Sequence, residues 1–235
     1  MIKAIFFDFN GVVIDDERLQ MSAYQEVLKG HGIELTEEQY FAALGMDDRT
    51  FTRVALERAE RFSDELLQSV LKEKAVLHRK LIEDELPLLP GVVTFIKAAA
   101  REFSLGVVSM ADQEEIGYVF DRAKLYPYFS VIVTADEVKV CKPAPDCYST
   151  ALKDLNELRR TQRKLPLLPA ECLVIEDSPP GIEAGRKAGM RTLGVTNTVS
   201  EQALREANAE VVTHSLADWT MEAVHLVFAK RKAAG

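Results

Sequence analysis

The chain has 235 residues, of which 47% are hydrophobic, and a formal net charge of −8 at pH 7. This length and hydrophobic content suffice for one large domain, or for a core domain with a smaller companion. The negative charge argues against nonspecific nucleic-acid binding, because that function needs a basic surface.

The sequence also argues against secretion and membrane insertion. Met1 leads directly into an apolar segment, without the basic and apolar regions of a signal peptide. No apolar run is long enough to span a bilayer. Cys141, Cys147 and Cys172 are odd in number and lack metal-site spacing, which indicates reduced thiols with structural roles. We therefore expect a cytoplasmic protein without nucleic-acid or membrane partners, and the sequence leaves open whether it is a monomer or a weak homodimer.

The first predicted strand covers residues 2–7 and ends at the carboxylate of Asp8. Asn10 and Gly11 form a short polar step before a second apolar run and three consecutive acids at residues 15–17. A buried strand that places an aspartate at its carboxyl end is a common way for an open α/β sheet to build an active site. Taken alone, Asp8 fits equally well as a residue that only terminates the strand.

Residues 17–83 are predicted to form an all-helical insert between the first strand and the rest of the sheet. Their apolar residues recur at helical spacing, with breaks near Gly30 and Gly45. Thr36 and Gln39 have the spacing of a capping box at a helix start. We expect this insert to be a cap domain that covers the core as a lid would.

The remaining residues, 1–16 and 84–235, are predicted to form the core domain. From residue 88 onward, strand-like apolar runs alternate with helical patterns, which is typical of a doubly wound parallel α/β sheet. The basic segment 156–164 is predicted to be a solvated helix end or loop, with a docking patch as the alternative. After the first strand, the predicted strands are residues 104–109, 130–134, 173–176, 192–195 and 210–212.

Polar residues stand at the ends of several of these strands. In a parallel sheet the carboxyl ends of the strands lie along one edge, where ligands bind. We therefore expect these polar side chains to share one site. They are Asp8, Ser109, Lys142 (which we place just past a strand) and the pair Glu176-Asp177.

The same residues resemble the motifs of the haloacid dehalogenase-like (HAD) phosphohydrolases, in the helical-cap subgroup that includes β-phosphoglucomutase and small-molecule phosphatases. Residues 8–13 resemble the first motif and Ser109 the second. Lys142-Pro143 resembles the third motif, and residues 175–178 the fourth. The match covers nearly the whole chain in the right order and spacing. It implies a HAD-like Rossmannoid core, an α/β doubly wound parallel sheet with an inserted α-helical cap.

The resemblance also implies a role for each position in a magnesium-dependent phosphatase. Asp8 would be the nucleophile that carries an aspartyl-phosphate. Ser109, with Met110 beside it, would bind the phosphoryl group, and Lys142 would neutralise it. Oxygen ligands suit Mg²⁺, which keeps several waters. The implied ligands of the cofactor Mg²⁺ are Asp8, the backbone carbonyl of Asn10, Glu176 and Asp177.

Asn10 departs from the family pattern, because hydrolases of this family carry a second aspartate there as general acid and base. An amide cannot take or give a proton near neutral pH, although its backbone contact to Mg²⁺ is preserved. Losing general acid–base catalysis costs about 10²–10⁴ in rate. Three explanations stay open: a slow enzyme, substitution by a neighbouring acid such as Asp16, or ligand binding without turnover. The sequence does not tell whether Asn10 is natural or was introduced to trap an intermediate.

Three further positions bear on the substrate. Gln20 stands where β-phosphoglucomutase has a proton-shuttling cap histidine, and Asp112 stands where the mutase holds a second phosphate, so we do not expect a mutase cycle. Arg49 matches a cap arginine that contacts substrate in the mutase, and it is either a substrate ligand, as Gln20 would be, or an exposed helix-cap residue. We predict Mg²⁺-dependent hydrolysis of a small phosphorylated metabolite, such as a sugar phosphate, through Asp8. The alternative is a catalytically silent phosphate-binding or regulatory protein.

Overall fold

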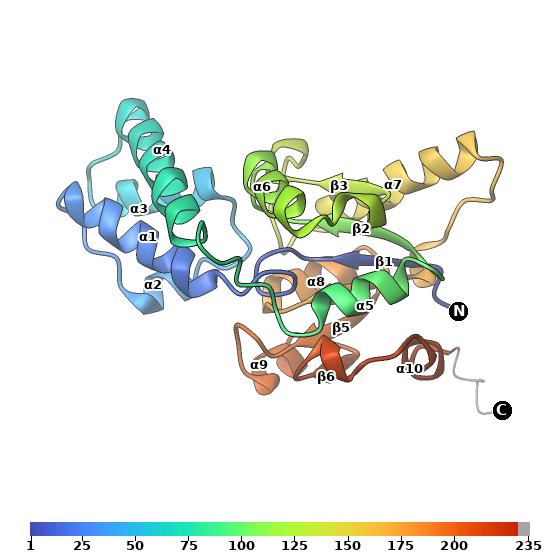
Figure 1. Cartoon of the computed structure of the whole chain (residues 1–235). Helices are drawn as coiled ribbons and strands as arrows, with labels where there is room; N and C mark the ends of the chain where they lie inside the picture. The colour runs from blue at the N-terminus through green and yellow to red at the C-terminus, as the bar shows by residue number, and fades with distance from the viewer. Residues whose placement is uncertain (230–235) are drawn as a thin grey trace.

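The computed structural model describes residues 1–229 of the chain. Its centre is a six-stranded sheet in the order β3-β2-β1-β4-β5-β6, in which all neighbouring strands are parallel. Because β1 lies in the middle of the sheet, the residues that follow it reach the middle of its carboxyl edge (Figure 1). The strands are β1 (Ala4–Phe7), β2 (Ser104–Val108), β3 (Val131–Val133), β4 (Cys172–Glu176), β5 (Arg191–Val195) and β6 (Val211–Thr213).

Helices cover both faces of the sheet, because successive residues of a buried strand point to opposite faces. In β1, Ile5 and Phe7 belong to one hydrophobic cluster, and Ala4 and Phe6 belong to another. This arrangement confirms the predicted doubly wound parallel α/β sheet. The first cluster is covered by α5 (Val92–Ala99), α6 (Gln113–Ala123) and α10 (Met221–Val227), and the second by α7 (Asp146–Thr161) and α8 (Pro179–Lys187), with α9 (Glu201–Glu206) packed on α8.

The helical insert lies beside the sheet and has its own hydrophobic cluster (Figure 1). Tyr24, Phe51 and Leu67 are among the side chains buried in that cluster. The predicted capping box is confirmed: Gln39 N–H donates to Thr36 Oγ1 at 3.2 Å, and Thr36 N–H donates to Gln39 Oε1 at 3.1 Å. The domain boundaries at residues 16 and 84 stay a prediction. The helices of the insert are α1 (Glu17–Gly30), α2 (Glu37–Phe41), α3 (Asp48–Arg58) and α4 (Asp64–Leu81).

Two features differ from the sequence prediction. The pattern does not predict α9, because its six residues are too few for a helical period to show. The placement of Lys142 just past a strand was wrong: β3 ends at Val133, and a 3₁₀ turn at Ala135–Glu137 and a loop come between them. The loop before α7 therefore delivers Lys142 to the sheet edge. The basic segment 156–164 is confirmed as a helix end, because α7 continues to Thr161.

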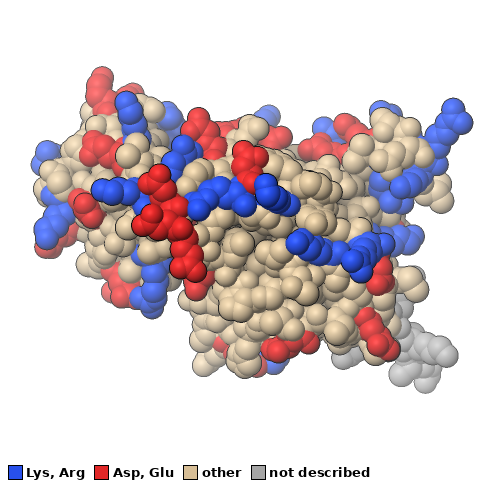
Figure 2. Space-filling view, in the orientation of Figure 1, with Lys and Arg blue, Asp and Glu red and all other residues tan. Residues whose placement is uncertain are grey.

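The surface carries both signs of charge. Figure 2 shows Lys and Arg side chains interspersed with Asp and Glu over the face in view. No helix within residues 1–229 is long and apolar enough to cross a bilayer. Burial raises the pKa of Cys147 to about 11 and that of Cys172 to about 12, so these two of the three free cysteines are protonated thiols at neutral pH.

Candidate active site

Asp8 lies at the carboxyl end of β1, and the sheet fixes its position. Its backbone N–H donates to the carbonyl of Ile175 at 2.9 Å, which continues the pairing of β1 with β4 past the end of the strand. The backbone N–H of Phe9 donates to Asp8 Oδ1 at 2.7 Å. Only 8% of Asp8 is exposed. The carboxylate is therefore held in one orientation at the edge of the sheet.

Lys142 is a buried cation between two carboxylates. Its Nζ lies 3.0 Å from Asp8 Oδ2 and 2.6 Å from Glu176 Oε1. The hydroxyl of Tyr148 donates to the same Glu176 oxygen at 2.6 Å. Burial lowers the pKa of Lys142, but the charges of Asp8 and Glu176 outweigh burial and hold that pKa above its ordinary value. The ammonium group therefore stays charged and can balance a bound anion.

Asp8, Glu176 and Asp177 form a buried cluster of carboxylates. One oxygen from each lies within 4.8 Å of the others. Burial and the neighbouring Glu176 raise the pKa of Asp8 to about 7, and burial and Asp8 raise the pKa of Asp177 well above its ordinary value. Asp177 Oδ2 has no hydrogen-bond partner among the described residues. A divalent cation would satisfy that oxygen and remove the repulsion, so this donor set fits Mg²⁺.

Gly11 shapes the turn that follows Asp8. Its φ of +69° lies in the left-handed region, which side-chain-bearing residues rarely adopt. A Cβ at this position would collide with the carboxylate of Asp177. Glycine therefore allows the chain to pass directly over Asp177 and to bring Asn10 to the same edge.

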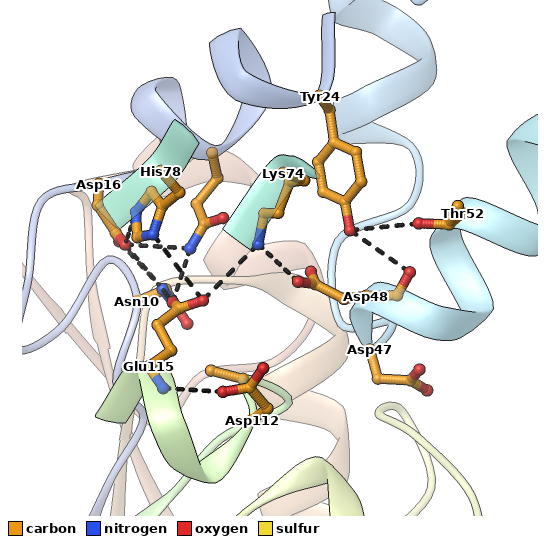
Figure 3. A network of polar contacts seen from close by, with 12 residues as sticks. Asn10, Asp16, Tyr24, Asp47, Asp48, Thr52, Lys74, His78, Asp112 and Glu115 are labelled. Atoms are coloured by element: carbon orange, nitrogen blue, oxygen red, sulfur yellow. Dashed lines mark hydrogen bonds and ion pairs between the residues drawn. The ribbon is translucent and has the colours of Figure 1, made fainter. Parts of the chain in front are cut away.

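The side chain of Asn10 lies between two carboxyl groups (Figure 3). Its Nδ2 donates to the two oxygens of Asp16 at 3.1 and 3.0 Å and to Glu115 Oε1 at 3.1 Å. On its other side, Ser109 Oγ lies 3.5 Å from Asn10 Oδ1 and accepts from the N–H of Ala111 at 3.0 Å. An amide suits this position because its N–H groups serve two carboxylates that only accept.

Cap side chains complete this network around Glu115 of α6. Gln20 of α1 donates its Nε2 to Glu115 Oε1 at 2.7 Å and to Asp16 Oδ2 at 3.2 Å. His78 of α4 is buried, and its Nε2 lies 3.0 Å from Asp16 Oδ2 without the alignment of a hydrogen bond. Lys74, one turn earlier, lies 3.7 Å from Glu115 Oε2. The cap and the core therefore meet through a buried polar network.

A pocket of about 80 Å³ lies between these groups. Small-molecule sites typically measure about 300–1,000 Å³. The space between the helical insert and the edge of the sheet is therefore narrow. The core end of the pocket is lined by Asp8, Asn10, Ser109, Met110, Lys142 and Asp177, and the cap end by Glu17, Gln20, Tyr40, Met46 and Asp48, with Glu115 between the two.

The structure places the predicted site residues unevenly. All of them line this pocket except Glu176, which is fully buried behind Lys142, and Arg49. Arg49 is exposed and lies outside the lining, whereas its neighbour Asp48 is part of it. Asp112, which we expected to repel a second phosphate, is the exposed N-cap of α6 and lies outside as well. Glu115, one turn further along α6, faces the pocket instead.

Sequence reasoning missed the acids and cations that the cap and α6 contribute. The only signal in the sequence lies in α4, where Lys74 and His78 continue the buried face of Leu67 and Val70 at helical spacing. Polar residues on an apolar face are buried in the folded protein and need partners there. The partners come from distant segments, so the sequence does not identify them.

Known proteins resemble this chain in both sequence and fold. A family model described as haloacid dehalogenase-like hydrolase matches residues 2–189. The phosphorylated carbohydrates phosphatase of Thermotoga maritima is 31% identical and is aligned over 88% of this chain and 92% of its own. Fructose-1-phosphate phosphatase YqaB of Escherichia coli is 26% identical and is aligned over 81% of this chain and 95% of its own. The crystal structure of a β-phosphoglucomutase from Clostridium difficile shares the fold, with a TM-score of 0.83 at 24% identity over 97% of both chains.

Proposed function

This chain belongs to the haloacid dehalogenase-like hydrolases, and from that premise we propose that it is a Mg²⁺-dependent phosphatase of small phosphomonoesters that uses Asp8 as its nucleophile. The observation that carries the proposal is the buried ion pair of Asp8 and Lys142, 3.0 Å apart, at the wall of a pocket that also contains Asp177. Phosphoryl transfer needs a positioned nucleophile and positive charge around the phosphoryl oxygens. The named relatives act on phosphorylated sugars, which supports a sugar phosphate as substrate.

In the proposed reaction, an oxygen of Asp8 attacks phosphorus and the ester oxygen leaves with its electron pair, taking up a proton to become an alcohol. Water then attacks the aspartyl-phosphate, gives up a proton, and releases phosphate and the free carboxylate of Asp8. Lys142 balances the negative charge in both steps, and Ser109 donates a hydrogen bond to the phosphoryl group. Mg²⁺, held by Asp8, Glu176, Asp177 and the backbone carbonyl of Asn10, would supply further positive charge to the phosphoryl oxygens.

The proton needed by the leaving alcohol has no obvious donor, because Asn10 cannot supply it. Asp16, the substitute suggested by the sequence, is fully buried and lies outside the pocket lining. Glu115 lines the pocket and lies 3.1 Å from Asn10 Nδ2, and burial raises its pKa. If a neighbouring acid replaces the missing one, this geometry favours Glu115 over Asp16. A slow enzyme without any replacement is the other catalytic possibility.

Substrate entry requires the cap to move. The closed pocket of about 80 Å³ is several times smaller than typical small-molecule sites of about 300–1,000 Å³. We infer that the cap opens to admit the ester and closes again to exclude water from the nucleophile.

The proposal is tested by measuring phosphate release against time with Mg²⁺ and a panel of sugar phosphates. We expect multiple turnovers by the parent protein and none by Asp8→Asn. Asp121→Asn, which changes an exposed aspartate of α6, is the matched control and should behave as the parent does. Release of no more than one equivalent of phosphate, together with tight binding of inorganic phosphate in calorimetry, would instead support the phosphate-binding alternative suggested by Asn10.

A further inference from the structure

The side-chain donors at the cap end of the pocket are already in use. Both hydrogens of Gln20 Nε2 are directed to carboxylates, at 2.7 Å from Glu115 and 3.2 Å from Asp16. The hydroxyl of Tyr40 donates to Glu17 Oε2 at 2.8 Å. A carboxylate or phosphate on the substrate brings only acceptors. At this end of the pocket, such a group would find these donors engaged.

Lys74, the cation next to the cap end of the pocket, is also paired with acidic side chains. Lys74 Nζ lies 2.6 Å from Asp48 Oδ2 and 3.7 Å from Glu115 Oε2, and its third neighbour is the ring of Tyr24, 5.1 Å away (Figure 3). Only 1% of Lys74 is exposed, and it lies outside the pocket lining. Within the described lining, Lys142 is the only Lys or Arg, and it is engaged at the phosphate end.

One acceptor at this end lacks a partner. Gln20 Oε1 is buried, in a residue that is 6% exposed, and has no hydrogen-bond partner among residues 1–229. Turning the amide over would place this oxygen against the carboxylates of Asp16 and Glu115, so the orientation is fixed by those acids. A buried unpaired acceptor costs about 1–3 kcal/mol, and a ligand that donates a hydrogen bond removes that cost.

We propose that the leaving group of the substrate is rich in hydrogen-bond donors, being polyhydroxylated or amine-bearing, and carries no second phosphate or carboxylate. Gln20 Oε1 accepts from one of these donors, and the carboxylate of Asp48 accepts from another. The inference rests on the proposed phosphatase function and narrows its substrate class.

Four substrates on one six-carbon skeleton test the proposal. Glucose 6-phosphate and glucosamine 6-phosphate bring donors, whereas 6-phosphogluconate and glucose 1,6-bisphosphate add a second anion. We expect kcat/KM to be at least about tenfold higher for the first pair, because unmatched charges penalise the second. Equal or higher values for the anionic pair would overturn the inference and leave the phosphatase function intact.

Two variants connect the selectivity to named side chains. Asp48→Asn removes the closest partner of Lys74. It should reduce the ratio of kcat/KM between the donor-bearing and the anionic substrates by about tenfold. Glu57→Gln, which removes an exposed acid from the same helix, should leave this ratio of kcat/KM unchanged. Gln20→Met should lower kcat/KM about tenfold more for glucose 6-phosphate than for p-nitrophenyl phosphate, which lacks donors. Equal losses on both substrates would show a purely structural role for Gln20 and contradict the proposal.

A binding measurement distinguishes a wrong inference about the substrate class from a wrong proposal of phosphatase activity. Competition against inorganic phosphate on Asp8→Asn ranks the four sugar phosphates without turnover. If the parent turns over neither these four nor the wider panel of sugar phosphates, the phosphatase proposal fails, and tighter binding of the donor-bearing pair would still support the donor-rich ligand. Tighter binding of the anionic pair would overturn it.

Discussion

Replacing Asn10 with aspartate tests the site most directly. In the parent protein, Nδ2 of Asn10 donates to Asp16 and to Glu115 at 3.0–3.1 Å. In Asn10→Asp, an oxygen faces the same two carboxylates. The variant also restores the residue type that hydrolases of this family use for acid–base catalysis. Two opposing effects follow, one on stability and one on rate.

The size of the stability effect follows from these distances. Two unit charges about 3 Å apart repel by about 5 kcal/mol at an effective dielectric constant of about 20. Keeping an aspartic acid protonated at pH 7 costs about 4 kcal/mol relative to its ordinary pKa. Protonation is therefore the cheaper solution, and the new carboxyl should fold with a pKa raised above its unfolded value. The variant should be close to the parent in stability near pH 4 and lose up to about 4 kcal/mol by pH 7.

Thermal unfolding at both pH values and phosphate release at pH 7 measure the two effects. For a chain of this length, about 4 kcal/mol corresponds to a fall in Tm of roughly 10 °C. Phosphate release should rise by about 10²–10⁴ if Asn10 limits turnover. A stability loss that is the same at pH 4 and pH 7 would refute the close approach of Asp16 and Glu115. An unchanged rate would refute the view that Asn10 is what slows the reaction.

Three other predictions test neighbouring groups. Lys142→Met leaves Asp8 and Glu176 without their cation, so the free energy of unfolding should fall by about 3–5 kcal/mol in chemical denaturation; a loss below about 1 kcal/mol would contradict the buried ion pairs. Mg²⁺ should bind more tightly as the pH rises through about 7, because Asp8, whose pKa burial raises to about 7, must lose its proton first. Calorimetry in two buffers of different ionisation enthalpy should detect the released protons, and pH-independent binding would speak against Asp8 as a ligand. Glu115→Gln should slow phosphate release more than Asp16→Asn does, because only Glu115 lines the pocket; the reverse order would point back to Asp16.

The fold and the core end of the site could be predicted because both follow from local rules. Strand-then-polar segments in a parallel sheet bring Asp8, Ser109 and Asp177 to one edge whatever the loops between them do. Their roles in catalysis remain proposals, but their proximity is a property of the topology.

The cap end could not be predicted, because it depends on helix phase and on contacts between distant segments. Arg49 and Asp48 are neighbours in α3, yet only Asp48 lines the pocket. Asp112 caps α6 from outside, and Glu115, three residues later, points inward. A shift of one residue on a helix rotates a side chain by about 100°, and no motif in the sequence sets that rotation. The matched family positions located the segments but not the side chains that face the substrate.

The polar contact that Lys74 and His78 of α4 make with Glu115 of α6 affects how easily the cap moves away from the core. An apolar contact between the cap and the core would resist opening, because separating it exposes apolar surface to water at a cost of about 25 cal/mol for each Å². Here, parting α4 from α6 returns Lys74, His78 and Glu115 to water, and their hydration offsets the contacts that are lost. Separating these polar groups therefore costs less free energy than separating an apolar contact of the same area would. Because these charges are buried while the insert and the core are in contact, dissolved salt should screen them only weakly in this arrangement.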